Sequence, residues 1–272
     1  MALHQAIRAE YDPAVYEPLV EVEDHHFWFR ARNRVIGALA AQLAAKLSPG
    51  YRVLEVGCGT GNVLRALTQA CPGGTVIGMD LFADGLRFAR ARLPNALLVR
   101  GDALHPPFAE RFEIVGMFDV LEHLEDDLGA LRALRLLITD RGRLILTVPA
   151  GRALWSYFDE ASRHVRRYEI EELRDKLTAA GFEVEFLSPY MGILYPTLWL
   201  GRRLAKRNHE PGVDPEVTRR LFDRELHVNS VVGTALGVVL RLERPWLLGR
   251  RRLPFGSSLV AIARPIGAVD AR

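Results

Sequence analysis

Three glycines at alternate positions, directly after an apolar run, constrain the fold of this chain more than any other feature. The run Val53–Val56 alternates β-branched and apolar side chains around Glu55, which is typical of a buried strand. Gly57, Gly59 and Gly61 permit positive φ angles and let backbone amides approach a ligand that a Cβ would block. A helix beginning after them would point its free N–H groups to the same place. The sequence therefore predicts a strand, a turn and a helix that bind a cofactor.

The spacing of these glycines indicates which class of cofactor the turn binds. A dinucleotide-binding turn carries glycines in the pattern G-x-G-x-x-G, whereas here Asn62 occupies the third position. Glu55 lies two residues before the first glycine, where its carboxylate would repel a pyrophosphate and attract an ammonium or amide group. Both observations disfavour a nicotinamide-dependent oxidoreductase, which we keep only as a less favoured alternative.

The bulk composition limits the class of protein. With 272 residues, 49% hydrophobic and 25% charged, the chain is typical of one large globular domain with an elaboration. Two cysteines make no disulfide framework, which favours a reducing compartment. Residues 1–23 carry charges throughout, so we expect neither a signal peptide nor a spanning helix there and predict a cytoplasmic location. A net charge of +3 is too mild and too scattered to favour nucleic-acid binding.

Apolar strands and amphipathic helices alternate regularly, which is typical of a mainly parallel sheet with helices on both faces. The expected strands are residues 53–56, 75–79, 96–99, 112–118, 143–148, 182–187 and 258–263, and the expected core helices are 62–70, 84–92, 124–138 and 170–180. We therefore predict an α/β fold, a Rossmann-like three-layer sandwich around a seven-stranded sheet. We assign residues 1–50 to an N-terminal helical lid, 51–189 to the cofactor-binding core, 190–255 to a helical insertion, and 256–272 to the last strand and a tail.

Acidic residues end three of the predicted strands. Asp80, Asp102 and Asp119 follow the second, third and fourth apolar runs. Ligands of such sheets lie at the carboxyl ends of the strands, so we expect the three carboxylates and the glycine turn to line one crevice. The alternative for any single one is an acid that caps the next helix.

The ordered set of glycines and acids resembles the class I S-adenosylmethionine-dependent methyltransferases over residues 27–188 and 253–265. Their cofactor carries an amino-acid end and a sulfonium cation but no phosphate, and their last strand runs antiparallel. The resemblance implies that Asp80, with Leu81, binds the ribose hydroxyls and that Asp102, with Ala103, receives the adenine amino group. It also implies a cofactor-binding set around the methionine end, made of Arg32, Glu55, Gly57, Gly59, Gly61, Phe118 and Asp119.

The resemblance predicts an enzyme that transfers a methyl group by in-line displacement, and an oxygen of a small-molecule acceptor is the favoured target. The alternative from another class is a cofactor-binding scaffold without activity, because a fold alone does not prove turnover.

The segment Asp119–Leu124 is similar to one in ubiquinone-biosynthesis O-methyltransferases and small-RNA 2′-O-methyltransferases, where such residues hold a divalent ion. This chain begins the segment with aspartate, where those families have glutamate. We therefore predict no resident metal and keep Asp119, Glu122 and His123 as the alternative ligand set. In the plain alternative, Glu122 and His123 cap a helix beginning near Leu124. His123 is the predicted general base, because an ordinary imidazole titrates near neutral pH.

Two further segments resemble the acceptor side of small-molecule methyltransferases. Their predicted substrate-binding residues are Trp28, Trp155, Tyr157, His164, Arg167 and Tyr168. Trp28 precedes an apolar helix, 35–47, that is expected to lie over the cofactor as a lid, and the alternative is that its ring packs on the core. Arg167 and Tyr168 have the alternative of anchoring the helix that follows them.

The insertion of residues 190–255 contains three helical patterns, at 193–206, 215–226 and 229–242. Two of its apolar runs end in basic clusters, which is typical of contact with a membrane surface but too short for a spanning helix. We favour a cap over the acceptor pocket and keep peripheral membrane contact, at the inner face of a membrane, as the alternative. A lipophilic, aromatic or lipid-linked acceptor would agree with either.

Overall fold

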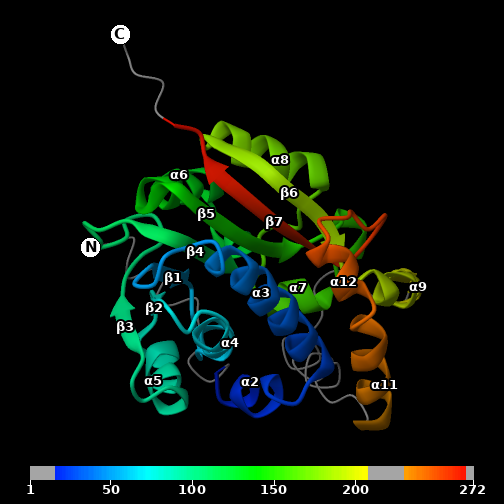
Figure 1. Ribbon diagram of the computed structural model, residues 1–272. Helices are drawn as coiled ribbons and strands as arrows, with labels where there is room; N and C mark the ends of the chain where they lie inside the picture. The colour runs from blue at the N-terminus through cyan, green and yellow to red at the C-terminus, as the bar shows by residue number, and fades with distance from the viewer. Residues whose placement is uncertain (1–15, 208–229, 268–272) are drawn as a thin grey trace.

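The computed structural model describes residues 16–207 and 230–267. Seven strands form one sheet in the order β3-β2-β1-β4-β5-β7-β6, in which β7 runs antiparallel to both of its neighbours and the other pairs are parallel (Figure 1). The strands are β1 Arg52–Val56, β2 Thr75–Asp80, β3 Leu97–Arg100, β4 Phe112–Phe118, β5 Ile138–Pro149, β6 Phe182–Tyr190 and β7 Ser258–Pro265. This arrangement confirms the predicted fold class.

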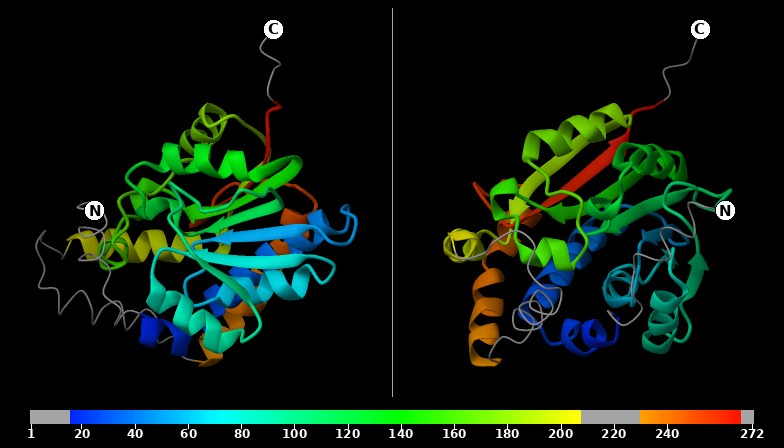
Figure 2. Two further views of the ribbon diagram at one scale, coloured as in Figure 1. Left: turned by 90° about the vertical axis from the view of Figure 1, so that its left-hand side faces the viewer. Right: turned by 180° about the vertical axis from the view of Figure 1, so that it is seen from behind.

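Helices cover both faces of the sheet, because each crossover between parallel strands passes over one face or the other (Figures 1 and 2). One face carries α3 (Phe27–Ala44), α4 (Asn62–Ala70) and α5 (Ala83–Arg92), with α2 (Tyr16–Glu23) below them. The other carries α6 (Asp127–Leu137) and α8 (Ile170–Ala179). Two separate hydrophobic clusters, one on each side of the sheet, make up the core.

Helix α3 corrects the prediction of a separate lid. Ile36, Leu39 and Ala40 are fully buried against the sheet, so the helix is part of the core layer. The apolar pattern of residues 35–47 is that of a core helix, and the sequence alone does not say what its apolar face covers. Only the first turns of α3 reach the edge where the glycine turn lies.

The region after β4 also differs from its prediction. A short 3-10 turn, η2 (Leu121–His123), comes first, and α6 begins only at Asp127. The cap of α6 is Asp126, whose carboxylate accepts a hydrogen bond of 2.8 Å from the N–H of Gly129. The alternative that Glu122 and His123 cap this helix is therefore wrong, and both side chains are left for other contacts.

Strand β6 continues past Leu187, where we expected it to end, through Pro189 to Tyr190. Proline has no N–H to donate to a neighbouring strand. Strand β6 tolerates it because it lies at the edge of the sheet and has only one neighbouring strand.

The insertion divides into two parts that lie against different elements. After η4 (Gly192–Leu194), helix α9 (Tyr195–Arg207) approaches the 3-10 turn η3 (Arg152–Leu154), where Arg202 donates a hydrogen bond to the carbonyl of Leu154. Helices α11 (Ser230–Leu240) and α12 (Glu243–Leu248) lie beside α3 (Figure 2). The predicted helix 215–226 falls outside the described residues. Among the helices that are described, none is long and apolar enough to cross a membrane.

Candidate functional site

The glycine turn between β1 and α4 has the backbone that its sequence requires. Gly57, Gly59 and Gly61 have φ angles of 77°, 47° and 76°, in the left-handed region that favours glycine. A Cβ on Gly57 would lie 2.3 Å from Cγ2 of Val120, and one on Gly61 would lie 3.1 Å from Ala89. A Cβ on Gly59 would meet nothing within 4 Å. The turn is thus packed on two sides and open at Gly59.

Asp80 fixes this turn from the end of β2. Its Oδ2 accepts a hydrogen bond of 2.7 Å from the N–H of Gly59, and its Oδ1 accepts one of 2.9 Å from the N–H of Phe82. Burial raises the pKa of this carboxyl, and the backbone donors partly oppose the rise. The structure therefore brings Asp80 and Gly59 together as predicted, with Leu81 half-buried next to them.

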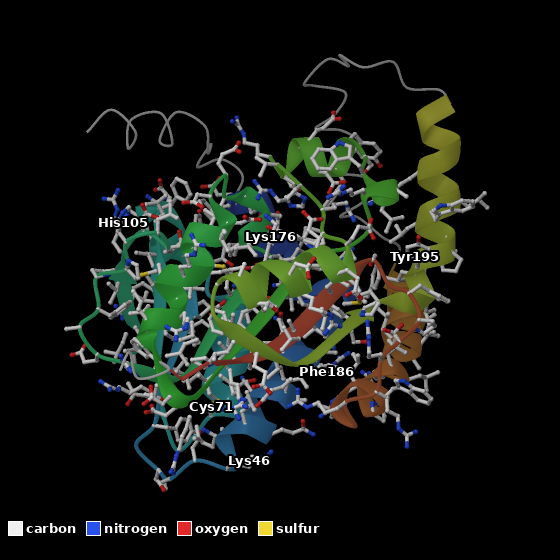
Figure 3. All side chains as sticks on the ribbon, turned by 90° about the horizontal axis from the view of Figure 1, so that it is seen from above. Lys46, Cys71, His105, Lys176, Phe186 and Tyr195 are labelled. Atoms are coloured by element: carbon white, nitrogen blue, oxygen red, sulfur yellow. The ribbon has the colours of Figure 1, made fainter. Side chains whose placement is uncertain are left out.

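Asp102 lies beyond the end of β3, at the outer part of the same edge. Its Oδ1 accepts a hydrogen bond of 2.9 Å from the N–H of Leu104, while Ala103 packs against the core. His105 is 3.7 Å away, and Figure 3 shows it at the opposite side of the molecule from Tyr195 of α9. Asp102 closes a tight turn and does not cap a helix, so the capping alternative does not apply to it.

Arg32 and Asp119, both predicted to meet the methionine end, form an ion pair of 2.8 Å with each other. Asp119 follows β4 with a φ of 55°, a left-handed backbone that aspartate tolerates better than most residues. The Arg32 guanidinium also lies 5.0 Å from the ring centre of Trp28, which is half-buried and packs on the core. Phe118 is buried at the end of β4 beside them. The packing alternative for Trp28 therefore holds, and its ring positions Arg32.

Replacing Arg32 by glutamine should lower the free energy of unfolding by about 2–3 kcal/mol, because Asp119 then keeps its charge without a partner in a largely buried place. Arg65→Gln is the matched control, since it breaks a 2.6 Å ion pair with Asp24 whose members are 38% and 30% exposed. We expect a loss of less than about 1 kcal/mol there. Urea unfolding of the cofactor-free proteins measures both, and equal losses would contradict the assigned role of the Arg32 pair.

The site holds more carboxyl groups than cationic groups. Glu55 and Glu122 are both buried, and Oε2 of Glu55 and both carboxylate oxygens of Glu122 lack a hydrogen-bond partner among the described residues. Burial raises the pKa of each of them well above its ordinary value, and Asp119 raises that of Glu122 further. Together with Asp80 and Asp119, they outnumber the two arginines close to them, which are Arg32, paired with Asp119, and Arg167, paired with Asp159. The arrangement suits a cationic ligand and disfavours a pyrophosphate.

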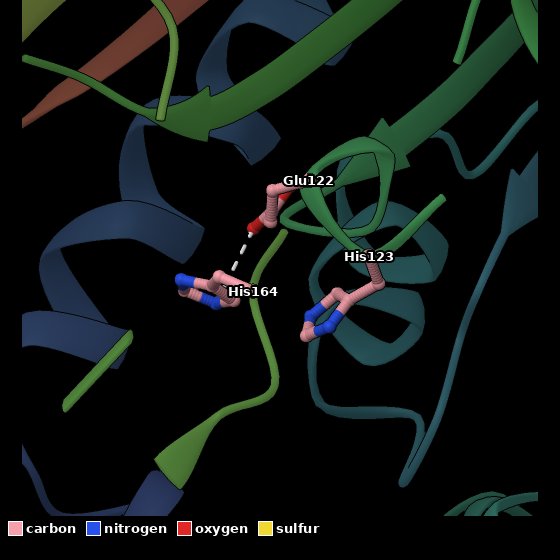
Figure 4. A group of neighbouring side chains, drawn as sticks. All are labelled: Glu122, His123 and His164. Atoms are coloured by element: carbon pink, nitrogen blue, oxygen red, sulfur yellow. Dashed lines mark ion pairs between the residues drawn. The ribbon is translucent and has the colours of Figure 1, made fainter. Parts of the chain in front are cut away.

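Glu122 faces two histidines (Figure 4). Its Oε1 is 3.9 Å from Nε2 of His164, and the rings of His123 and His164 lie edge to face with centres 4.8 Å apart. One ligand atom from each of the three residues lies within 4.8 Å of the others, so they form a group that fits a metal ion. This group differs in one member from the alternative ligand set named from the sequence, because it contains His164 instead of Asp119, which is paired with Arg32.

The burial of His123, together with the nearby charge of His164, lowers the pKa of His123 from 6.5 to about 4. Between these two values the unfolded chain binds a proton that the folded chain does not, so stability falls as the pH falls through this window. His123→Gln should remove this loss, which we expect to be on the order of 2 kcal/mol. Unfolding by urea at several pH values checks it. Parallel curves for the two proteins would show that the histidine does not titrate in this way.

The loop after β5 is organised by Asp159 of helix α7 (Tyr157–Ala161). Its carboxylate is fully buried, lies 2.9 Å from Nδ1 of His164 and accepts a hydrogen bond of 2.6 Å from Nε of Arg167. Both partners hold the pKa of Asp159 below its ordinary value, although burial opposes this. Asp159 therefore fixes the imidazole of His164 in one orientation.

Two predicted substrate-binding residues are corrected. Tyr168 is completely buried and its hydroxyl donates a hydrogen bond of 2.7 Å to Asp127 of α6, while Arg167 is 5% exposed and binds Asp159 and the carbonyl of Ala150. The anchoring alternative holds for both residues. Trp155 and Tyr157 are half-buried, and their contact with the acceptor stays a prediction.

Comparison with known families shows to which protein family the chain belongs. A family described as a methyltransferase domain matches residues 28–186, more than half of the chain. The chain belongs to this methyltransferase family. The match confirms the resemblance to class I S-adenosylmethionine-dependent methyltransferases.

Curated relatives cover the core of this methyltransferase chain. A trans-aconitate 2-methyltransferase of Rhodopseudomonas palustris is 32% identical over 170 residues, which are 61% of this chain and 62% of the relative. A malonyl-(acyl-carrier protein) O-methyltransferase of Herminiimonas arsenicoxydans is 33% identical over 166 residues, 56% of this chain and 63% of the relative. The chain thus matches less than two thirds of the length of either.

Solved structures share the fold of this methyltransferase chain. An S-adenosylmethionine-dependent methyltransferase of Clostridium acetobutylicum superimposes with a TM-score of 0.52 at 11% identity, covering 96% of this chain and 95% of that one. DesVI of Streptomyces venezuelae has a TM-score of 0.51 at 20% identity, covering 66% and 94%. At these identities the likeness shows the fold alone.

No local pattern indicates the contacts that hold α2 against the glycine turn of this methyltransferase. Glu23 accepts a hydrogen bond of 2.6 Å from the hydroxyl of Thr60 and forms an ion pair with Arg92, which lies 69 residues further along the chain. Asp24 pairs with Arg65 in the same way. Tyr190 was also missed: it is buried at the end of β6, and burial and Asp119 raise the pKa of its hydroxyl. Such pairings join distant segments and leave no local pattern.

Proposed function

We propose that the chain transfers a methyl group from S-adenosylmethionine to an oxygen of a small, uncharged acceptor. The observation that carries the proposal is the surplus of carboxyl groups around Arg32, where Oε2 of buried Glu55 and both oxygens of buried Glu122 lack a hydrogen bond within the described residues. A sulfonium and an ammonium group would stabilise the ionised form of these carboxyls, whereas the phosphates of a nicotinamide dinucleotide would oppose their ionisation. The open backbone at Gly59 and the acids at the carboxyl ends of β2, β3 and β4 fit the remaining parts of the cofactor.

The bound cofactor supplies an activated methyl group, so the protein has to position the acceptor, exclude water and receive a proton. His164 is suited to receive it, because Asp159 holds one ring nitrogen and stabilises the imidazolium that forms. His123 was the predicted base, but its lowered pKa makes it a weaker proton acceptor. We place His123 beside the acceptor and assign the base to His164.

The charges of the loop favour an uncharged hydroxyl as the acceptor. Arg166 is paired with Asp127 and Arg167 with Asp159, so neither guanidinium is available for an anion. Trans-aconitate, named for the first relative, is an anion and would face the carboxylates of Glu122 and Asp119 here. Helix α9, joined to the loop through Arg202 and Leu154, supports the expected cap over the acceptor.

A divalent cation is a second candidate at the same place, because both oxygens of buried Glu122 lack partners. Glu122, His123 and His164 would hold it, and it would orient the acceptor oxygen and lower the pKa of its hydroxyl. Our expectation of no resident metal stays a prediction. Cobalt(II) absorbance of the wild type and of His164→Gln tests it without reference to turnover, since a bound ion would give a spectrum that the variant loses.

Calorimetry with S-adenosylmethionine and with NAD tests the cofactor, and a methyl-labelled cofactor with native extract tests the transfer. We expect binding of the first ligand only, and label in a neutral hydroxyl compound. Binding without transfer to any compound would favour the inactive scaffold, and binding of NAD alone would favour the oxidoreductase. Label in a carboxylate ester would overturn the proposed acceptor class while leaving the enzyme class intact.

A further inference from the structure

Helix α11 exposes an apolar stripe. The helix has no charged residue, and Val231, Ala235, Val238 and Leu242 recur along one side at helical spacing. Val231 is 75% exposed and Leu242, just after the helix, is 73% exposed. The other side of α11 packs Leu236 and Leu240 against the cluster that contains α3. An exposed stripe of this kind marks an interaction surface.

A cluster of arginines lies beside α11. Arg30 and Arg34 of α3 approach Arg241 and Arg244, and the charges of the other three lower the pKa of Arg34, although burial contributes most. Within the described part of the chain, none of the four forms an ion pair with a carboxylate. No carboxylate of the described residues is therefore paired with these four arginines to offset their mutual repulsion.

A cavity of about 530 Å³ opens among these arginines. Arg30, Arg34, Arg65 and Arg244 line it, together with Glu23 and Asp24. Both carboxylates are already engaged, Glu23 with Arg92 and Asp24 with Arg65. None of the predicted cofactor or acceptor residues lines this cavity, which lies between α3 and α4.

Helix α12, which contacts α11, adds aromatic and further basic groups. Trp246 of α12 is 47% exposed, and the guanidinium of Arg251 lies 5.2 Å from its ring centre. Tryptophan and arginine next to an apolar helix are the groups that contact lipid headgroups at a membrane interface. Most large apolar side chains that the described residues expose lie in the same insertion, among them Ile193, Leu200, Val232 and Phe255.

We propose that α11, α12 and the outer face of α3 bind the surface of a membrane containing anionic phospholipids, with a lipid phosphate in the arginine cavity. The apolar stripe then lies among the upper acyl chains, and the contact is interfacial, since no described helix is long enough to span. A second copy fits less well, because a two-fold contact on this face brings the arginines of both copies together. Nucleic acid would offset the arginines but leaves the stripe of Val238 and Leu242 in water.

Sedimentation with vesicles tests the proposal on the full chain. We expect binding to vesicles of phosphatidylcholine mixed with phosphatidylglycerol, weak binding to phosphatidylcholine alone, and weaker binding to the mixed vesicles at high salt. The double variant R34Q/R244Q should bind at least about tenfold more weakly. The matched control R132Q/R141Q removes the same charge from exposed arginines of α6 and the start of β5, and it should bind like the wild type.

The variant V238S/L242S separates the apolar part of the contact from the charged part. It should bind the mixed vesicles several-fold more weakly while keeping the salt dependence. Circular dichroism and cofactor calorimetry show that each variant is folded, and neither readout depends on methyl transfer.

Four results would overturn the membrane contact. They are equal binding to neutral and mixed vesicles, an unchanged affinity in R34Q/R244Q, a dimer in solution that buries this face, and RNA bound more tightly than the mixed vesicles. Glycerol phosphate that binds the cavity while vesicles do not bind would assign the arginines to a free anion instead.

Discussion

Turnover should fall about 100-fold or more when His164 is replaced by glutamine, while the affinity for S-adenosylmethionine stays close to that of the wild type. The imidazole is 11% exposed, is held by Asp159 and lies next to Glu122, so its loss removes the proposed proton acceptor without opening the glycine turn. Steady-state kinetics on the acceptor, with calorimetry for the cofactor, measures the two effects separately. Partial recovery of turnover by added imidazole is expected, and a purely structural role would not produce it.

Two further histidines serve as comparisons. His123→Gln should lower turnover less than His164→Gln, because the ring of His123 already bonds to the backbone of Arg163 and has a pKa of about 4. His25 is exposed, and His25→Gln should leave turnover unchanged. If His123→Gln causes the larger loss, the role of base returns to His123, as the sequence predicted.

Gly57→Ala should lower the free energy of unfolding by about 3 kcal/mol and weaken cofactor binding. A left-handed backbone costs a residue with a Cβ about 1–2 kcal/mol, and overpacking adds about 1–3 kcal/mol. Here the new methyl group would lie 2.3 Å from Val120. Because Val120 lies between Asp119 and Glu122 in the sequence, a shift of Val120 would also displace the acceptor side of the site. Urea unfolding without cofactor and calorimetry with it measure the two losses.

Gly59→Ala is the matched control within the same turn. Its φ is also positive, but a Cβ there meets nothing within 4 Å, so only the backbone cost of about 1 kcal/mol should appear. Equal destabilisation by the two substitutions would mean that Val120 moves aside freely, and the proposed link between the glycine turn and the acceptor side would be wrong.

The strands and the glycine turn were predictable because their information is local. The run Val53–Val56 is followed directly by the turn with the three glycines. The parallel direction of most strands follows from their alternation with helices. The ends of elements were harder to predict. Apolar periodicity placed the start of the predicted helix 124–138 at Leu124, whereas the cap at Asp126 makes α6 begin at Asp127.

In the site, only the residues placed directly at the end of a predicted strand could be located from the sequence. Asp80 met Gly59 as expected, but the ion pair of Arg32 and Asp119 joins positions 87 residues apart, and Asp159 joins His164 to Arg167 through a buried network. Charge pairing of this kind depends on which arginine reaches which acid in space. The same limit explains why Arg167 and Tyr168, polar and next to the acceptor loop, belong to the protein interior.

Asp119 has to meet two requirements that few residue types meet together. Its backbone lies at a φ of 55°, which glycine, asparagine and aspartate accept most readily, and its side chain carries the charge that pairs with Arg32. Glutamate supplies the charge on a longer arm that fits this backbone less well, while asparagine and glycine fit the backbone but leave the guanidinium unpaired. The range of tolerated residues at this position is therefore narrower than either its charge or its conformation implies alone, and the usual exchange of one acid for the other is not a conservative change here.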